Sequence, residues 1–289
     1  MPHALIFIDA NIYLKLYKVI EGRALLEPLR QFADSILVTR QVVDEVERNK
    51  LKVAATFFAD RAKTFNPGIS DHLFEGEPNS DKLREQVETA ANLRKTLDKL
   101  FKETIEKVAR SEDEVSRKLE PLFALALKAT PEQLERARAR RECGNPPGKC
   151  NQPLGDQITW EQILGNACGV KHFFLVAEDR DYFTEYKGKH YLNPLLHKEL
   201  AAASKTSVHV RCTADLQEAL REFAAVTSAP TDTIPTGARA KEIDKEMAPP
   251  TFGYDGMADE IAIRNRWLHQ TRTAALIASV AAQQSGNFP

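Results

Sequence analysis

Two apolar runs in this sequence end in aspartate residues that could bind a metal ion. Asp9 closes the run at 4–8, and Asp179 and Asp181 directly follow the run at 173–177. Both runs have the length and composition of buried strands. In an open α/β sheet the carboxyl ends of parallel strands form one crevice, where ligands bind. We therefore expect these carboxylates to meet, although they lie far apart in the chain.

Two further acids lie in segments that would reach the same crevice. Glu45 sits in a helix that follows the apolar run at 36–38, and Asp156 opens a helix-like stretch at 155–160. Carboxylates gathered in one crevice repel one another by roughly 3–4 kcal/mol per close pair at an effective dielectric of about 20. A hard divalent cation, Mg²⁺ or Mn²⁺, is the usual compensation. The predicted metal ligands are Asp9, Asp156, Asp179 and Asp181, and the predicted catalytic residues are these four and Glu45.

Each of these residues also has a structural explanation when it is taken alone. Asp9 could be a cap or turn residue, and Asp156 could be a helix N-terminal acid that the macrodipole favours. Asp44 competes with Glu45 for the site but is expected to face solvent. Thr39 could order the site, although an N-cap for the helix that begins near Gln41 explains it equally well.

The composition does not announce a nucleic-acid partner. The 289 residues contain 40 Lys and Arg against 41 Asp and Glu, for a formal net charge of −1. The hydrophobic fraction of 43% is typical of globular proteins. We find no apolar run near the roughly 20 residues that span a bilayer, so we predict a cytoplasmic protein without a membrane partner.

Nucleic-acid binding would therefore depend on a local basic patch. A basic run leads into the Asp156 segment, where it could follow a phosphate backbone. A solvated helix end, whose positive charge suits a C-terminus, explains the run equally well. Further cations lie near the strand ends, and Tyr186 could stack on bases. The predicted nucleic-acid-binding residues are Arg40, Arg136, Arg138, Arg140, Arg141, Lys149 and Arg180.

The order of the expected elements predicts an α/β fold with a mostly parallel sheet. Strand-like and helix-like segments alternate through residues 1–225, apart from a long charged helical segment at about 80–141. We interpret that segment as a helical insertion, and a coiled coil is the alternative. Residues 226–256 have the proline-rich composition of a linker. A C-terminal helical extension at 257–289 would then dock on its own domain, on a second copy or on another protein.

Four motifs, in this order, resemble those of PIN-domain (PIN-like) nucleases, in particular a bacterial group with a helical insertion. They lie at 7–11, 42–46, 146–160 and 176–183. The resemblance implies a three-layer α/β/α sandwich in which Asp9 is the first metal ligand, Asn11 helps to order the site and Glu45 occupies a ligand position. The sequence departs from the pattern at Ala177-Glu178, where Ser or Thr is common.

The function implied by this resemblance is a metal-dependent endoribonuclease that cleaves RNA, and single-stranded DNA is a further candidate substrate. A toxin held by an antitoxin, or a defence nuclease, would suit the sequence. A phosphatase of the haloacid-dehalogenase type is the enzyme alternative, but it needs an Asp at Asn11 and an acid at Trp160. A non-catalytic binding or scaffold protein with the same fold is the alternative from another class.

Overall fold

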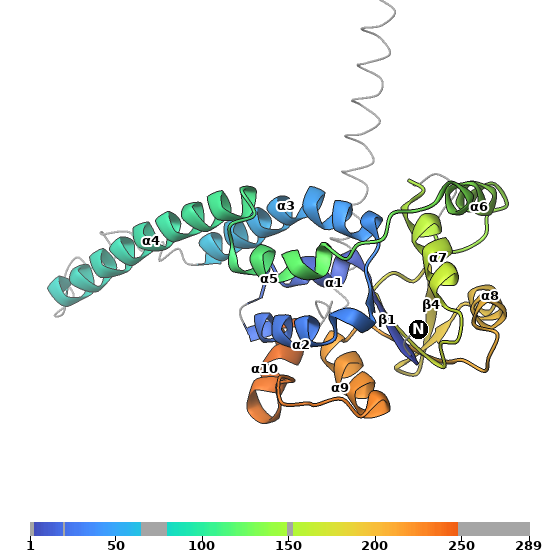
Figure 1. The fold of residues 1–289 in the computed structure, drawn as a ribbon. Coiled ribbons are helices and arrows are strands. Elements are labelled where there is room, and N and C mark those ends of the chain that lie inside the picture. The colour runs from blue at the N-terminus through green and yellow to red at the C-terminus, as the bar shows by residue number, and fades with distance from the viewer. Residues whose placement is uncertain (1–2, 20, 65–79, 149–152, 248–289) are drawn as a thin grey trace, which may run out of the picture. The chain divides into compact units, whose positions relative to one another are not determined.

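A single six-stranded sheet, in the order β2-β1-β3-β6-β5-β4, is the centre of the computed structural model, which describes residues 3–19, 21–64, 80–148 and 153–247 (Figure 1). The strands are β1 (Ala4–Ile8), β2 (Ile36–Leu37), β3 (His172–Val176), β4 (Phe183–Tyr186), β5 (Lys189–Leu192) and β6 (His209–Thr213). Strands β2, β1, β3 and β6 run parallel, and β5 and β4 form an antiparallel hairpin at one edge. The α/β class and the mostly parallel sheet are confirmed. The sequence did not predict the hairpin.

Helices lie on both sides of the sheet (Figure 1). The helices of the described residues are α1 (Ala10–Lys15), η1 (Glu21–Leu25), α2 (Leu26–Gln31), η2 (Ala33–Ser35), α3 (Arg40–Thr64), α4 (Ser80–Ala109), α5 (Glu114–Phe123), α6 (Pro131–Glu142), α7 (Gly155–Asn166), α8 (Pro194–Ser204), α9 (Leu216–Thr227) and α10 (Gly237–Met247). None of the described helices is long and apolar enough to cross a membrane.

The core explains why the central strands carry apolar residues without alternation. On one face of the sheet, the ring of Phe174 contacts Phe223 of α9. On the other face, Phe7 lies against Tyr182, which in turn contacts Trp160 of α7. Strands that are buried on both faces need apolar side chains at every position, which is the pattern of parallel strands covered by helices. The predicted three-layer sandwich is confirmed.

The helices expected as a separate insertion are partly built into the core. Val115 and Leu119 of α5 and Ala137 of α6 are buried. Helix α4 packs against α3, where Phe58 stacks on Phe101 with 4.8 Å between ring centroids. Only α4 therefore resembles an added arm, while α5 and α6 form part of the domain body.

The linker expected at 226–256 is wrong over much of its length. Helix α9 continues to Thr227, and α10 follows with Ala240, Ile243 and Met247 buried. The proline-rich stretch before α10 is only a short connection, because the apolar residues of α10 return the chain to the body. One compact unit accordingly spans Met1–Met247. The C-terminal helix predicted at 257–289 lies outside the described residues.

Candidate metal centre

Asp9 lies at the carboxyl edge of the sheet, where the ends of two neighbouring strands meet. Its backbone N–H donates to the carbonyl of Val176 at 2.9 Å, which places the ends of β1 and β3 side by side. The residue is only 9% exposed. The Asn11 amide Nδ2 donates to Asp9 Oδ2 at 3.3 Å, so Asn11 lies where it can orient the carboxylate.

Three more aspartates gather at this edge. Asp156, Asp179 and Asp181 each offer an oxygen, and these oxygens all lie within 4.8 Å of one another. The turn after β3 holds two of them in place, since the Asp181 N–H donates to Asp179 Oδ1 at 2.9 Å. The structure therefore brings together side chains from α7 and from the loop after β3, as the sequence predicted.

The pKa of Asp9 shows that the remaining acids share this environment. Burial, and next the charge of Glu45, raise the pKa of Asp9 from 3.8 to about 7, with Asp156 and Asp179 adding to the rise. A hydrogen bond from the Ala10 N–H acts in the opposite direction. Asp9 thus lies near Glu45, Asp156 and Asp179, and the last two belong to the group that includes Asp181.

The start of α3 positions Glu45, and Thr39 begins that helix. Thr39 is fully buried, and its Oγ1 accepts from the Val42 N–H at 3.3 Å, as an N-cap does. The same oxygen lies 3.4 Å from the Thr159 hydroxyl of α7. The N-cap explanation of Thr39 is confirmed, and its contact with Thr159 joins the start of α3 to the helix that carries Asp156.

Gly155 begins α7 beside the first turn of α3. A Cβ atom at Gly155 would lie 2.7 Å from Nε2, at the flexible end of the Gln41 side chain, so a substitution here would require that side chain to move. Asp156 and Glu45 therefore approach Asp9 from two different helices.

Arg48 is a neighbour of the cluster that the sequence did not single out. Burial raises the pKa of Glu45, the charge of Arg48 opposes that rise, and Asp179 adds to it. Arg48 is exposed, as is Lys52 one helical turn further along α3. Both follow Glu45 at spacings of three and seven residues, so their place on one helix face could have been read from the sequence.

Glu178, the residue that departs from the family pattern, does not simply face solvent. Its carboxylate forms an ion pair with Lys15, whose Nζ also donates to the carbonyl of Met247 at 2.8 Å. The Lys15 side chain is only 13% exposed. The extra acid beside Asp179 is therefore neutralised by a partner of its own, and the same lysine ties the end of α10 to the start of the site.

The predicted role of Arg140 in nucleic-acid binding is corrected by its position. Arg140 is 8% exposed, and its guanidinium donates to Glu161 at 2.9 and 3.1 Å and forms an ion pair with Glu199. Arg136 binds the second oxygen of Glu161 at 2.8 Å. The buried Glu161 of α7 and the partly exposed Glu199 of α8 use these arginines as structural partners, so Arg140 cannot reach a phosphate in this arrangement.

The other predicted cations have mixed surroundings. Arg138 pairs with Glu135, and Arg40 pairs with Asp44, which makes Asp44 a surface ion-pair residue rather than a ligand. Arg141 is half-buried and Arg180 is exposed. Lys149 lies outside the described residues.

Tyr182 and Trp160 form the floor beneath the acids. Tyr182 is fully buried, and burial first, then the nearby carboxylates, raise the pKa of its hydroxyl well above the usual value. Trp160 Nε1 donates to Glu199 at 2.8 Å. Tyr182 is a packing residue, as expected. An indole fixed in this way occupies the position where the phosphatase alternative requires an acid, so that alternative loses its support.

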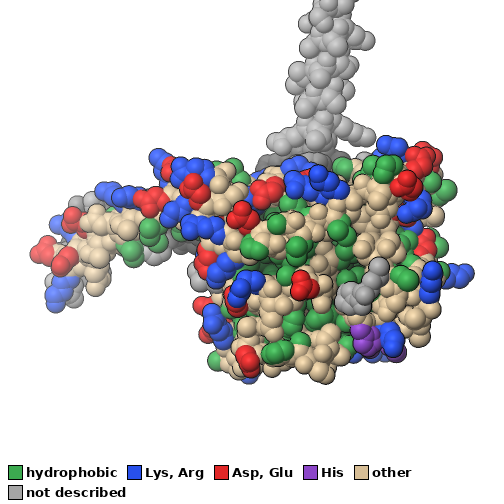
Figure 2. Space-filling model, in the orientation of Figure 1, with side chains coloured by type: hydrophobic (Ala, Val, Ile, Leu, Met, Phe, Trp, Pro, Cys, Tyr) green, Lys and Arg blue, Asp and Glu red, His purple; other side chains and the backbone are tan. Residues whose placement is uncertain are grey.

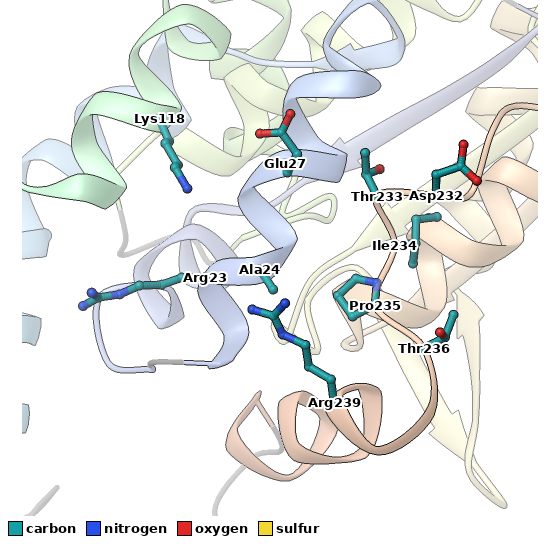
Figure 3. Close-up of a pocket in the computed structure, with 10 residues that line it drawn as sticks. All are labelled: Arg23, Ala24, Glu27, Lys118, Asp232, Thr233, Ile234, Pro235, Thr236 and Arg239. Atoms are coloured by element: carbon teal, nitrogen blue, oxygen red, sulfur yellow. The ribbon is translucent and has the colours of Figure 1, made fainter.

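An open pocket of about 460 Å³ lies elsewhere, among η1, α5 and the segment before α10 (Figure 3). It contains Arg23, Lys118 and Arg239, but none of the clustered acids. Lys118 and Arg23 pair with Glu114, and Arg239 pairs with Glu21. Because these cations are neutralised by their own partners, the pocket does not compete with the acid cluster as the functional site.

The donor set of the cluster fits a hard divalent cation. All five ligand candidates are carboxylates, which Mg²⁺ and Mn²⁺ prefer. Two oxygens bound to one Mg²⁺ at about 2.1 Å are at most about 4.2 Å apart. The spacing within 4.8 Å seen among Asp156, Asp179 and Asp181 needs only a small adjustment to reach that value. The residues present therefore fit the metal site that the sequence predicts.

A family model described as a PIN like domain matches residues 5–192 of the chain. The match includes every acid of the cluster, from Asp9 to Asp181, and the resemblance drawn from the four motifs is confirmed. A search of curated proteins and a search of solved structures found no match.

Proposed function

The chain belongs to the PIN-like domain family, and from this premise we propose that it is a metal-dependent endoribonuclease that hydrolyses phosphodiester bonds in RNA. Members of this family are commonly nucleases that use divalent metal ions. The observation that supports the proposal most strongly is the gathering of acids at the carboxyl edge of the sheet. Oxygens of Asp156, Asp179 and Asp181 lie within 4.8 Å of one another, and Asp9 is close enough to Asp156 and Asp179 for their charges to raise its pKa.

In this proposal Asp9 and Asp179 are the direct ligands of Mg²⁺ or Mn²⁺. Asp156, Asp181 and Glu45 act through bound water or hold a second ion. A bound divalent ion supplies an activated water and stabilises charge on the leaving oxygen of an in-line displacement. Asn11 keeps the Asp9 carboxylate oriented, and the buried floor at Tyr182 limits access of water from below the site.

The substrate backbone would be held by the exposed cations that flank the cluster. Arg48 and Lys52 extend from Glu45 along α3, and Arg180 follows Asp179 on the other side. Among the described residues none of these three forms an ion pair, in contrast to Arg136, Arg138 and Arg140 of α6. Figure 2 shows Lys and Arg side chains gathered over α3. A strand that contacts Arg48 and Arg180 together would pass across the acids, and single-stranded DNA would fit the same path.

Substitution of the central acids tests the proposal. Asp9→Asn and Asp179→Asn should each reduce cleavage of RNA in Mg²⁺ or Mn²⁺ by about a thousandfold, because several kcal/mol of transition-state stabilisation depend on the metal. Asp44→Asn is the matched control, since Asp44 lies on the same helix as Glu45 but pairs with Arg40. Its activity should stay at the parental value.

Three outcomes would contradict the proposal. RNA cleavage that survives in both Asn variants would place the activity elsewhere. Turnover of small phosphomonoesters without RNA cleavage would favour the phosphatase, and binding of RNA without any cleavage would favour a non-catalytic protein of the same fold.

Control by a partner belongs to the same proposal. A toxin or defence nuclease needs a restraint, and residues 257–289, which lie outside the described residues, carry the helical pattern that motivates this idea. A cut after Met247 keeps the whole compact unit and removes the extension. If self-association, partner capture and activity are unchanged in that truncated chain, the extension has no such role.

A further inference from the structure

The β4–β5 hairpin reaches the edge of the sheet where the acids lie. In β5, His190 pairs with Cys212 of β6, and Cys212 pairs with Leu175, the second-last residue of β3. Strand β5 runs antiparallel to β6, so Lys189, the residue before His190, lies level with the end of β3. Tyr186 of β4 pairs with Lys189 and lies at the same level. The turn that follows Tyr186 extends past the carboxyl edge.

The sideways distance is short on the scale of an RNA substrate. Neighbouring strands lie about 4.8 Å apart, so β5 and β4 are roughly 10 Å and 14 Å from β3. The turn after β3 carries Asp179. A strand of RNA held at the acids would reach the hairpin within a few nucleotides.

One face of this hairpin is aromatic and exposed, and we call its residues Thr184, Tyr186, Lys189 and Tyr191 the tyrosine face. Tyr186 lies opposite Lys189, and Thr184 lies opposite Tyr191, so all four side chains point to the same side. The tyrosines are 61% and 52% exposed. As diagonal neighbours they lie about 7–8 Å apart, so two adjacent bases can each find a ring.

The core does not require these tyrosines. The other face of the hairpin carries Phe183 and Leu192, which are buried, and the ring of Phe183 contacts His190. That face and the pairing of β5 with β6 attach the hairpin to the body. The two rings of the tyrosine face stay exposed to solvent, where a ligand can reach them.

Lysines beside the rings indicate the kind of ligand. Lys187 in the turn and Lys189 in β5 are exposed, and Lys187 Nζ lies 5.5 Å from the centroid of the Tyr186 ring. Aromatic rings that stack on bases, combined with cations that hold the backbone, are the usual elements of single-stranded nucleic-acid binding. A protein partner could pack on the tyrosine rings, but its binding would not require a lysine beside each ring.

We propose that the tyrosine face is a base-stacking subsite that binds unpaired nucleotides beside the bond cut at the acid cluster. This inference rests on the proposed nuclease function. It makes the hairpin a specificity element, since bases within a duplex are stacked on one another and cannot lie on Tyr186 and Tyr191. In this proposal the acid cluster cleaves the bond, and the hairpin binds only strands in which the bases beside that bond are unpaired.

Binding to labelled RNA in the full-length Asp9→Asn protein tests the subsite, because this background keeps the RNA intact. The probes are a short single-stranded RNA and the same strand annealed into a duplex. Replacing both tyrosines (Tyr186→Ala with Tyr191→Ala) should weaken single-strand binding by tenfold or more, as is typical when stacked aromatic rings are lost, and leave duplex binding unchanged. Tyr→Phe at both positions should keep the affinity. The control Glu185→Gln, at an exposed residue on the opposite face of β4, should not lower it.

Three results would overturn the subsite: unchanged single-strand affinity, an equal loss for single strand and duplex, or a change of self-association in the alanine variant. The proposed nuclease is judged separately, by cleavage in proteins with and without Asp9→Asn. A tyrosine-dependent preference for single strands without any cleavage would reject the nuclease and keep the subsite. Cleavage that is indifferent to the tyrosines would do the reverse.

Discussion

Two clusters of buried carboxylates lie in this domain, and their charges are compensated in opposite ways. Between α6, α7 and α8, the Glu161 side chain is 5% exposed, and Arg136 and Arg140 each bind one of its oxygens. At the carboxyl edge of the sheet, Asp9 is 9% exposed, and the groups that most affect its charge are other acids. Similar burial thus occurs at Glu161 beside two arginines and at Asp9 beside other acids.

The difference shows which cluster is complete in the protein alone. The arginine network satisfies its charges within the chain, so its role is to join three helices. At the acid cluster, burial and then the charges of Glu45, Asp156 and Asp179 raise the pKa of Asp9 to about 7. A buried charge without a counter-charge is costly, and it persists in proteins where a ligand supplies what is missing.

The largest expected effect comes from breaking the complete cluster. Glu161→Ala should destabilise the domain by about 3–5 kcal/mol, because it removes the buried carboxylate partner of Arg140 and leaves the partly exposed Glu199 and the Pro146 carbonyl. Thermal unfolding should show a fall of roughly 6–20 °C in Tm. Glu135→Ala, which removes the exposed partner of Arg138, is the control and should change Tm by only a degree or two. Equal effects of the two variants would mean that the network contributes no more than a surface pair.

The acid cluster should respond to pH in the opposite sense from ordinary paired carboxylates. Asp9 has a pKa of about 7 in the folded protein against 3.8 as its ordinary value. The folded state therefore binds more protons between these values, and in chelator its stability should fall as pH rises from about 4 to about 7. The ceiling for this loss is about 4 kcal/mol.

Urea unfolding across that pH range, with and without Mg²⁺ or Mn²⁺, measures this effect. Added metal should restore stability above neutral pH, and Asp9→Asn should flatten the pH dependence, because it removes the titrating group. If the stability of Asp9→Asn in chelator depends on pH as strongly as that of the parent, the titration of Asp9 is not the cause of the pH dependence.

The comparison also explains what the sequence could predict. Asp9 and Asp179 each follow an apolar run, so strand position alone places them at one sheet edge. Thr39 and the helix after it were equally readable, since an N-cap is a local signal. These features depend on neighbours in the chain and on one rule of sheet topology.

Other features depended on contacts between distant segments. Arg136 and Arg140 have the spacing of a solvated basic helix, and only the packing of α6 on α7 shows that Glu161 claims them. The hairpin at 183–192 consists of two four-residue strands, and only Phe183 and Leu192 are buried. The sequence therefore shows no clear alternation of apolar and polar residues there. Helix α10 was not predicted because prolines precede it, and such a composition is typical of linkers. Here these prolines lie in a short connection between α9 and α10.

A smaller effect, on the salt dependence of RNA binding, is expected when the exposed cations of α3 are removed. Arg48→Gln with Lys52→Gln removes two exposed charges next to Glu45 and should lower the slope of log affinity against log salt by about two, roughly one per phosphate contact. RNA affinity should fall severalfold at moderate salt in the Asp9→Asn background. Lys118→Gln is the control, because Lys118 lies on α5 and pairs with Glu114. An unchanged salt slope in the α3 variant would move the substrate path away from α3.

The smallest effect is expected at Arg136, where the two kinds of cation meet. Its side chain is 57% exposed, yet its Nε is engaged with Glu161, so the sequence would assign it to RNA and the structure to the network. Arg136→Gln should lower stability by only about 1 kcal/mol or less, because Arg140 still holds Glu161 and solvent screens the outer pair. The salt slope of RNA binding should not change. If that slope falls by about one while Tm stays constant, Arg136 leaves Glu161 to contact the substrate. Helix α6 would then belong to both the structural network and the RNA-binding surface.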